Sequence, residues 1–242
     1  SSLLDLNNML NASIHRGPDD YGTWQHQEVN LGHRRLSIHD LSQAGHQPMT
    51  CASNRYVLVF NGEIYNFEEL KLQLFGCKWR GHSDTEVMLA AFNYWGIERS
   101  LTKFNGMFAF AVWDKKKKQL TLARDRFGEK PLYYYHNNGV FAFASEIKSL
   151  EANESLVLQI DRSALIHQLE SAYIPAPLSI YTHVKKLPPG NLLTFSVDKG
   201  VSYSTYWNLV GQIKTAKQNI FCCEQEAIEA LDTTLKRAVK LR

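Results

Sequence analysis

The sequence predicts an α+β fold in which antiparallel sheets pack face to face or are covered by helices. Short apolar strands follow one another in pairs that are separated by turn residues. Most of these strands are apolar on both sides of the alternation, which indicates burial of both faces of the sheets. Helical segments with recognisable start and stop signals interrupt the strands.

Four hairpins are expected along the chain. In the first, the dipeptide Asn61-Gly62 separates two strand-like segments and is typical of a tight turn. In the second, four consecutive lysines form the tip, and a solvated hairpin tip is a better interpretation of them than a binding patch. The paired strands are 55–60 with 63–65, 107–113 with 119–123, 131–135 with 140–144, and 192–197 with 201–203.

Helices are expected where apolar residues recur at helical spacing behind a capping residue. Ser83 and Glu86 match a capping box, Gly96 is the matching stop signal, and Asp161 is a second N-cap. The last helix carries acidic residues early and basic residues late, which suits the helix dipole. The expected helical segments are 67–75, 87–95, 163–170 and 224–241.

The composition bounds the class of protein. Hydrophobic residues make up 44% and charged residues 21% of 242 residues, as in an ordinary globular protein. A net charge of +3 argues against nucleic acid or an anionic membrane as a partner. The sequence contains no apolar run long enough to span a bilayer and no secretory signal. Four cysteines without a CxxC pair predict no zinc site, no disulfide framework and a cytoplasmic protein.

Four polar clusters are candidates for chemistry, and three of them suit a free amino acid. An arginine offers a planar fork for a carboxylate, and Glu63 with Asp84 could hold an ammonium group. The Asn61 amide and the Gly62 backbone N–H could together form an oxyanion hole. The clusters are 15–20, 32–38, 61–63 and 83–86.

Each cluster also has an ordinary structural interpretation. Asn61-Gly62 is usually a turn, Asp84 is usually a helix cap, and the pair Arg34-Arg35 is usually a solvated strand end. The spacing of these residues therefore permits an amino-acid site without establishing it.

Collinear motifs over almost the whole chain resemble those of one enzyme family. The chain resembles the glutamine-hydrolysing asparagine synthetases, a branch of the class II glutamine amidotransferases. The similar segments are HRGPDDYG at 15–22, LGHRRLSIHDLSQAGHQPM at 31–49, VFNGEIYNFEELK at 59–71, GHSDTEVML at 81–89, FNGMFAFAVWD at 104–114, LARDRFGEKPLYYY at 122–135, FASEIKSL at 143–150, YIPAP at 173–177 and KLPPGNLLTF at 186–195.

This resemblance implies an N-terminal-nucleophile hydrolase fold, a four-layer αββα sandwich with two antiparallel sheets. It implies that Arg35 binds the α-carboxylate of glutamine, while Arg34 matches a variable position and receives no role. It also implies that Asn61 and Gly62 form the oxyanion hole, and that Glu63 and Asp84 bind the ammonium group. The residues expected to line the carboxylate side are Leu36, Ser37, Ile38 and His39.

The resemblance also sets expectations for the two ends. The family nucleophile is an N-terminal cysteine on a first strand, and this chain is expected to start beyond that strand, with residues 1–10 in the helix that follows it. Ser1 is not expected to replace the cysteine. The fragment alone is therefore expected not to hydrolyse glutamine and to be unstable. Residues 1–207 are expected to form the glutaminase domain, and residues 208–242 a linker plus the first helix of a truncated ATP-dependent synthetase domain.

The expected function follows from the resemblance. The parent protein is expected to be a ligase that releases ammonia from glutamine for ATP-dependent amidation of aspartate to asparagine, with family members often dimeric. No metal or cofactor is expected in this chain, since ATP and Mg²⁺ belong to the synthetase domain. Two alternatives stay open: a non-catalytic glutamine-binding or docking module, and an amidotransferase of the same family with another acceptor.

Overall fold

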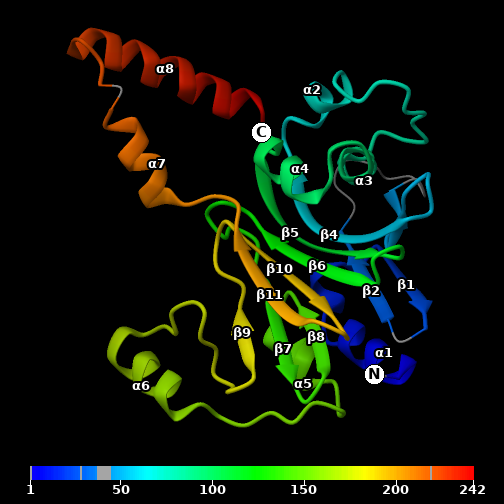
Figure 1. Ribbon diagram of the computed structural model, residues 1–242. Helices are drawn as coiled ribbons and strands as arrows, with labels where there is room; N and C mark the ends of the chain where they lie inside the picture. The colour runs from blue at the N-terminus through cyan, green and yellow to red at the C-terminus, as the bar shows by residue number, and fades with distance from the viewer. Residues whose placement is uncertain (1, 28, 37–44, 219) are drawn as a thin grey trace.

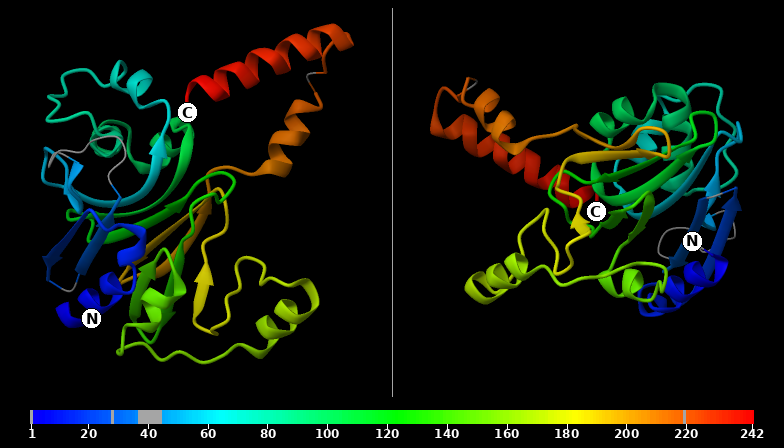
Figure 2. Two further views of the ribbon diagram at one scale, coloured as in Figure 1. Left: turned by 180° about the vertical axis from the view of Figure 1, so that it is seen from behind. Right: turned by 60° about the horizontal axis from the view of Figure 1, so that its bottom comes forward.

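The chain folds into stacked layers of helix, sheet, sheet and helix (Figures 1 and 2). The structure is a computed structural model and describes residues 2–27, 29–36, 45–218 and 220–242. Helices α2, α3 and α4 cover the outer face of a six-stranded sheet. The shorter strands lie on its inner face, and α1 and α5 pack beyond them.

Six of the described strands form one antiparallel sheet in the order β11-β10-β6-β5-β4-β3. Its centre is built from long apolar strands, because both faces of this sheet are covered. The strands are β3 (Met49–Thr50), β4 (Tyr56–Ile64), β5 (Gly106–Asp114), β6 (Gln119–Arg124), β10 (Asn191–Ser196) and β11 (Gly200–Thr205).

The second β-layer consists of two separate antiparallel units. A hairpin pairs β1 with β2, and a three-stranded sheet has the order β8-β7-β9. The strands are β1 (Asp20–His26), β2 (Val29–Arg35), β7 (Tyr133–Asn137), β8 (Val140–Ala144) and β9 (Val184–Lys186).

Three buried clusters fill the spaces between the layers. One lies between the outer helices and the six-stranded sheet around Phe92 and Phe110, a second between the two β-layers around Leu31 and Leu122, and a third beneath β7 and β8 around Leu150. The helices are α1 (Leu3–Asn11), the 3₁₀ turn η1 (Ile14–Arg16), α2 (Phe67–Lys71), α3 (Asp84–Trp95), α4 (Ile97–Lys103), α5 (Ile147–Glu151), α6 (Arg162–Ser171), α7 (Leu209–Ala216) and α8 (Glu224–Lys240).

The last two helices, α7 and α8, extend away from the layered body (Figure 2). The end of α8 returns toward α2, where Arg237 forms an ion pair with Glu69 at 3.6 Å and the Arg242 guanidinium lies over the ring of Tyr65. Neither helix has a buried residue. No helix in the described ranges is both long and apolar enough to cross a membrane.

The structure corrects the expected first hairpin. Asn61 and Gly62 do not form a turn, because β4 continues through them and stays in register with β5, opposite Ala109 and Phe108. Nine consecutive paired residues outweigh the local turn preference of the dipeptide. The other three expected hairpins are confirmed.

The helix predictions need three smaller corrections. Helix α2 ends at Lys71, and residues 208–223 contain α7, whose first turn is capped by the Asn208 side chain. Ser83 caps α3 as predicted, but the second half of the capping box is wrong. The Glu86 carboxylate accepts hydrogen bonds from Arg80 and Gly81 instead of from Ser83.

Candidate functional site

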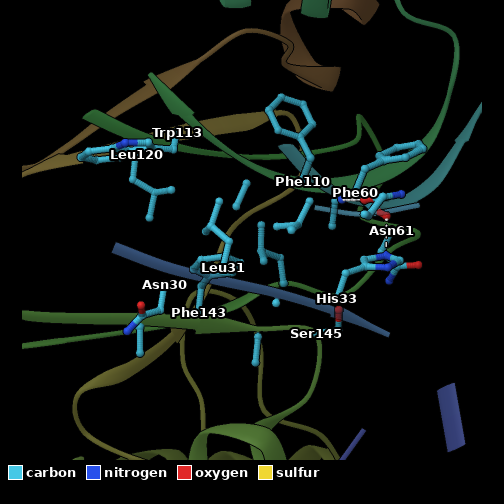
Figure 3. Close-up of a pocket in the computed structure, with 18 of the residues that line it drawn as sticks. Asn30, Leu31, His33, Phe60, Asn61, Phe110, Trp113, Leu120, Phe143 and Ser145 are labelled. Carbon is cyan, nitrogen blue, oxygen red and sulfur yellow. Dashed lines mark hydrogen bonds between the residues drawn. The ribbon is translucent and has the colours of Figure 1, made fainter. Parts of the chain in front are cut away.

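A cavity of about 1040 Å³ lies between the two β-layers. Its walls come from β2, β4, β5 and β8, and Figure 3 shows Trp113 and Leu120 at one end and His33 and Asn61 at the other. The cavity therefore lies inside the sandwich, where segments distant in the sequence face one another.

Alternation along β2 and β4 decides which side chains face this cavity. Side chains two residues apart in a strand share a face. On β2, Gly32 and Arg34 face α1, whereas Leu31, His33 and Arg35 share the opposite face. On β4, Val59, Asn61 and Glu63 share the face of Val59, which lies between the two β-layers. Each strand thus presents an apolar residue, then a neutral polar one, then a charged one.

Beyond its short pairing with β3, the edge of β4 that faces away from β5 is held by side chains of the described residues. The backbone N–H and C=O groups of odd-numbered residues face β5, as the hydrogen bond from the Tyr65 N–H to the Asn105 oxygen shows. The backbone groups of even-numbered residues therefore face the opposite edge. There the Phe60 N–H donates to Gln47 Oε1 at 2.7 Å, and the Ile64 N–H donates to Asp84 Oδ2 at 2.9 Å. By the same alternation the Gly62 N–H points to this edge, which borders the cavity.

Only glycine fits at position 62. Its φ is +155°, and a Cβ there would overlap the carbonyl oxygen of Met107 on the neighbouring strand. The close approach of β4 and β5 therefore explains a glycine that the sequence suggests for a turn.

Asp84 reaches the site from the first turn of α3. Ser83 caps this helix by accepting a hydrogen bond from the Thr85 N–H at 3.1 Å, and the Asp84 side chain is buried beside it. Because its Oδ2 binds the Ile64 N–H, the carboxylate is fixed next to Glu63. The first turn of α3 thus connects the helix layer to β4 beside the cavity.

Arg35 lines the same cavity, two residues beyond His33 on β2. Its guanidinium packs so closely on Gly45 that a side chain at position 45 would overlap it. Leu36 also lines the cavity and is exposed. The other residues predicted for the carboxylate side, Ser37, Ile38 and His39, lie outside the described residues.

The structure brings Arg35, Asn61, Gly62, Glu63 and Asp84 together at one cavity. The roles predicted for these residues stay predictions, since no bound ligand tests them. Among the residues that the structure describes, no group of three or more His, Cys, Asp or Glu side chains is arranged to hold a metal ion.

His33 is a cavity residue that the sequence did not single out. Its Nε2 lies 3.0 Å from the Phe60 oxygen, which can only accept, so Nε2 carries the proton. Burial lowers the pKa of His33 to about 4, and the nearby positive charge of Arg35 also lowers it, while the hydrogen bond to Phe60 opposes the shift. The ring is therefore neutral near pH 7, with Nδ1 as an acceptor.

Three buried polar atoms at this cavity have no hydrogen-bond partner among the described residues. They are His33 Nδ1, Asn61 Nδ2 and Trp113 Nε1. Buried polar atoms are normally paired, because an unpaired one costs about 1–3 kcal/mol. Their position at a cavity indicates a ligand or solvent partner. For His33, a sequence signal was available: it lies two residues before Arg35 on the same strand, so the two side chains share a face.

The profile of the family described as glutamine amidotransferase domain matches residues 2–207. The chain belongs to this family. Its resemblance to the glutamine-hydrolysing asparagine synthetases is also confirmed, since curated relatives of that description are 37–40% identical to it.

Two relatives illustrate the range of names. Asparagine synthetase [glutamine-hydrolyzing] 1 of Bacillus subtilis (strain 168) is 40% identical over 204 residues, which cover 84% of this chain and 31% of that protein. Amidase chry2 of Gibberella zeae is 34% identical over 242 residues, which cover 98% of this chain and 35% of that protein. The chain thus spans about a third of the length of these relatives.

Solved structures support the fold. A glutamine phosphoribosylpyrophosphate amidotransferase from B. subtilis, solved with ADP and GMP, has a TM-score of 0.62 at 19% identity and covers 84% of this chain and 46% of its own. An allosteric regulatory enzyme of purine biosynthesis has a TM-score of 0.55 at 22% identity and covers 74% and 35%. The predicted N-terminal-nucleophile hydrolase fold is confirmed.

Proposed function

We propose that this cavity binds L-glutamine for the release of ammonia from its side-chain amide. Arg35 binds the α-carboxylate, Glu63 and Asp84 bind the α-ammonium group, and Asn61 with Gly62 polarises the carboxamide. The observation that carries the proposal is that one guanidinium and two carboxylates line the same cavity as Asn61 and Gly62.

Charge supports this assignment. A planar guanidinium matches a carboxylate with two parallel hydrogen bonds, whereas two carboxylates suit an ammonium group. A free α-amino acid carries both groups on one carbon, so Arg35, Glu63 and Asp84 complement its head. The neutral residues next in line, His33 and Asn61, suit an uncharged side chain.

The strand edge supports the chemistry. Attack on an amide carbon moves negative charge to its oxygen, and donors fixed in advance stabilise that charge. The Asn61 Nδ2 group and the Gly62 N–H are two such donors from adjacent residues. Hydrogen bonds from Phe60 to Gln47 and from Ile64 to Asp84 hold β4 in position on both sides of Gly62.

Equilibrium binding to this chain tests the proposal. We expect calorimetry to give saturable binding of L-glutamine, and much weaker binding of D-glutamine and of glutaramate, which lacks the α-amino group. The variant Asp84→Asn should weaken the binding of L-glutamine more than the binding of glutaramate. Equal binding of L-glutamine and glutaramate would remove the assigned role of the two carboxylates.

For the longer protein we propose an asparagine synthetase that acts in the cytoplasm, as a homodimer, with aspartate as the acceptor. The names of the relatives support the asparagine synthetase activity, and the family resemblance implies aspartate and the dimer. Two carboxylates beside Arg35 do not fit the triphosphate of ATP, so ATP and Mg²⁺ are proposed to bind to other residues, in a synthetase domain that follows a boundary near Trp207. Full-length protein with ATP, glutamine and aspartate should form asparagine, and product from another acceptor alone would favour the alternative amidotransferase.

A further inference from the structure

The end of the cavity where His33 and Asn61 lie holds an unpaired acceptor beside an unpaired donor. His33 Nδ1 and Asn61 Nδ2 are both buried and both lack a hydrogen-bond partner among the described residues. Their residues are neighbours in space, because the His33 ring donates to the carbonyl of Phe60, which directly precedes Asn61 (Figure 3). The first atom can accept a hydrogen bond, and the second can donate one.

This pair matches the two ends of a primary carboxamide. A carboxamide has an oxygen that accepts and an NH₂ group that donates, while a carboxylate at neutral pH has acceptors only. A carboxylate in the same place would set its lone pairs against the bare Nδ1 of His33. The pair therefore favours the amide over the acid.

Position along the strands places the carboxamide there. Arg35 and Glu63 are each two residues further along their strands than His33 and Asn61, a step of about 6.8 Å. An amino acid whose head binds the charged end extends its side chain toward the neutral pair. Beyond that pair the walls are apolar, with Leu31 and Val59.

We propose that His33 is a specificity-determining residue that accepts a hydrogen bond from the side-chain NH₂ group of glutamine and so discriminates against glutamate. The inference rests on the proposed glutamine site. The bond from Nε2 to Phe60 fixes the tautomer, so that Nδ1 is the acceptor. Discrimination of this kind is strong when the wrong ligand leaves a buried polar group unpaired.

Two variants of His33 separate its two nitrogens. In His33→Gln, the amide nitrogen can still donate to Phe60, but no acceptor occupies the position of Nδ1. In His33→Asn, the amide oxygen can occupy the position of Nδ1, but the bond to Phe60 is lost. His167→Gln on the exposed face of α6 is the matched control for the change of residue type.

Calorimetry with L-glutamine and L-glutamate measures the ratio of their dissociation constants. We expect unchanged chain and His167→Gln to prefer glutamine strongly, His33→Gln to lose roughly tenfold of that preference, and His33→Asn to keep most of it. Full preference in a folded His33→Gln variant would overturn the proposal.

A measurement on the unchanged chain does not depend on how the variants fold. With ¹⁵N-labelled histidine, the Nδ1 resonance of His33 should move as expected for an accepted hydrogen bond when glutamine is added, and should not move so with glutamate. If glutamine binds but the Nδ1 resonance does not move, the proposed role of His33 is refuted and the proposed function is not. Absence of any binding of glutamine to the unchanged chain would instead refute the proposed function.

Discussion

Replacement of the buried Asp125 carboxylate by an amide should destabilise the fold strongly. Asp125 is 1% exposed and follows β6. Its Oδ1 accepts from the N–H groups of Phe127 and Glu129, both at 3.0 Å, and its Oδ2 accepts from those of Phe108 at 3.2 Å and Lys130 at 3.0 Å. One carboxylate therefore holds the segment that follows β6 against β5.

The magnitude follows from the number of donors. In Asp125→Asn, the new NH₂ group faces two backbone N–H groups, whichever way the amide is turned. Each lost hydrogen bond to a charged group is worth about 1.5–3 kcal/mol, so the two together cost about 3–6 kcal/mol. Since a domain is stable by about 5–15 kcal/mol, the variant should be close to the limit of folding.

Urea unfolding followed by circular dichroism measures this loss. For Asp125→Asn we expect the midpoint to fall by about 1–3 M, with a slope of about 2–3 kcal/mol/M. Asp198→Asn, at an exposed position in the turn between β10 and β11, is the control and should change stability by less than about 0.5 kcal/mol. A loss below about 1 kcal/mol in Asp125→Asn would show that the four hydrogen bonds do not support the fold as described.

Three further changes test the site and the electrostatics. Gly62→Ala, whose methyl group would overlap the Met107 carbonyl, should cost about 2–4 kcal/mol in unfolding experiments and abolish glutamine binding, whereas Gly211→Ala in α7 meets no atom closer than 3.7 Å and should be neutral or stabilising. Arg35→Lys should raise the glutamine dissociation constant about tenfold in calorimetry, because a lysine cannot form two parallel hydrogen bonds; an unchanged constant would contradict a bidentate contact. Burial disfavours the charged form of Glu146, but hydrogen bonds from its basic neighbours outweigh this effect and lower its pKa from 4.5 to about 2. The contribution of Glu146 to folding stability is therefore fully present above pH 4.5 and is lost as the pH falls toward 2. Glu146→Gln should therefore remove about 1–2 kcal/mol near pH 6 and little near pH 2 in urea titrations, and an equal loss at both values would be inconsistent with this linkage.

Patterns that local physics determines were predicted well. The hairpin around the four lysines and the cap of Asp161 on α6 depend on neighbouring residues only, and both are confirmed. The αββα layering followed from strands that are apolar on both faces together with the family resemblance.

Features that depend on distant partners were predicted less well. Asn61-Gly62 prefers a turn locally, yet pairing with β5 keeps β4 extended through it. The hairpin of β1 and β2 was missed because its residues are mostly polar and partly exposed, with Leu31 buried among them. The tautomer of His33 depends on the Phe60 carbonyl from another strand, so no sequence pattern could assign it.

The side chains that bind the edge of β4 beyond its pairing with β3 also protect the molecule from unwanted association. An open strand edge is a template for pairing with a second chain. Here Gln47 and Asp84 accept hydrogen bonds from the N–H groups of Phe60 and Ile64, and His33 donates to the Phe60 carbonyl. These backbone groups are therefore not available to pair with an incoming strand. Selection on these three residues would therefore act on the solubility of the protein as well as on its chemistry.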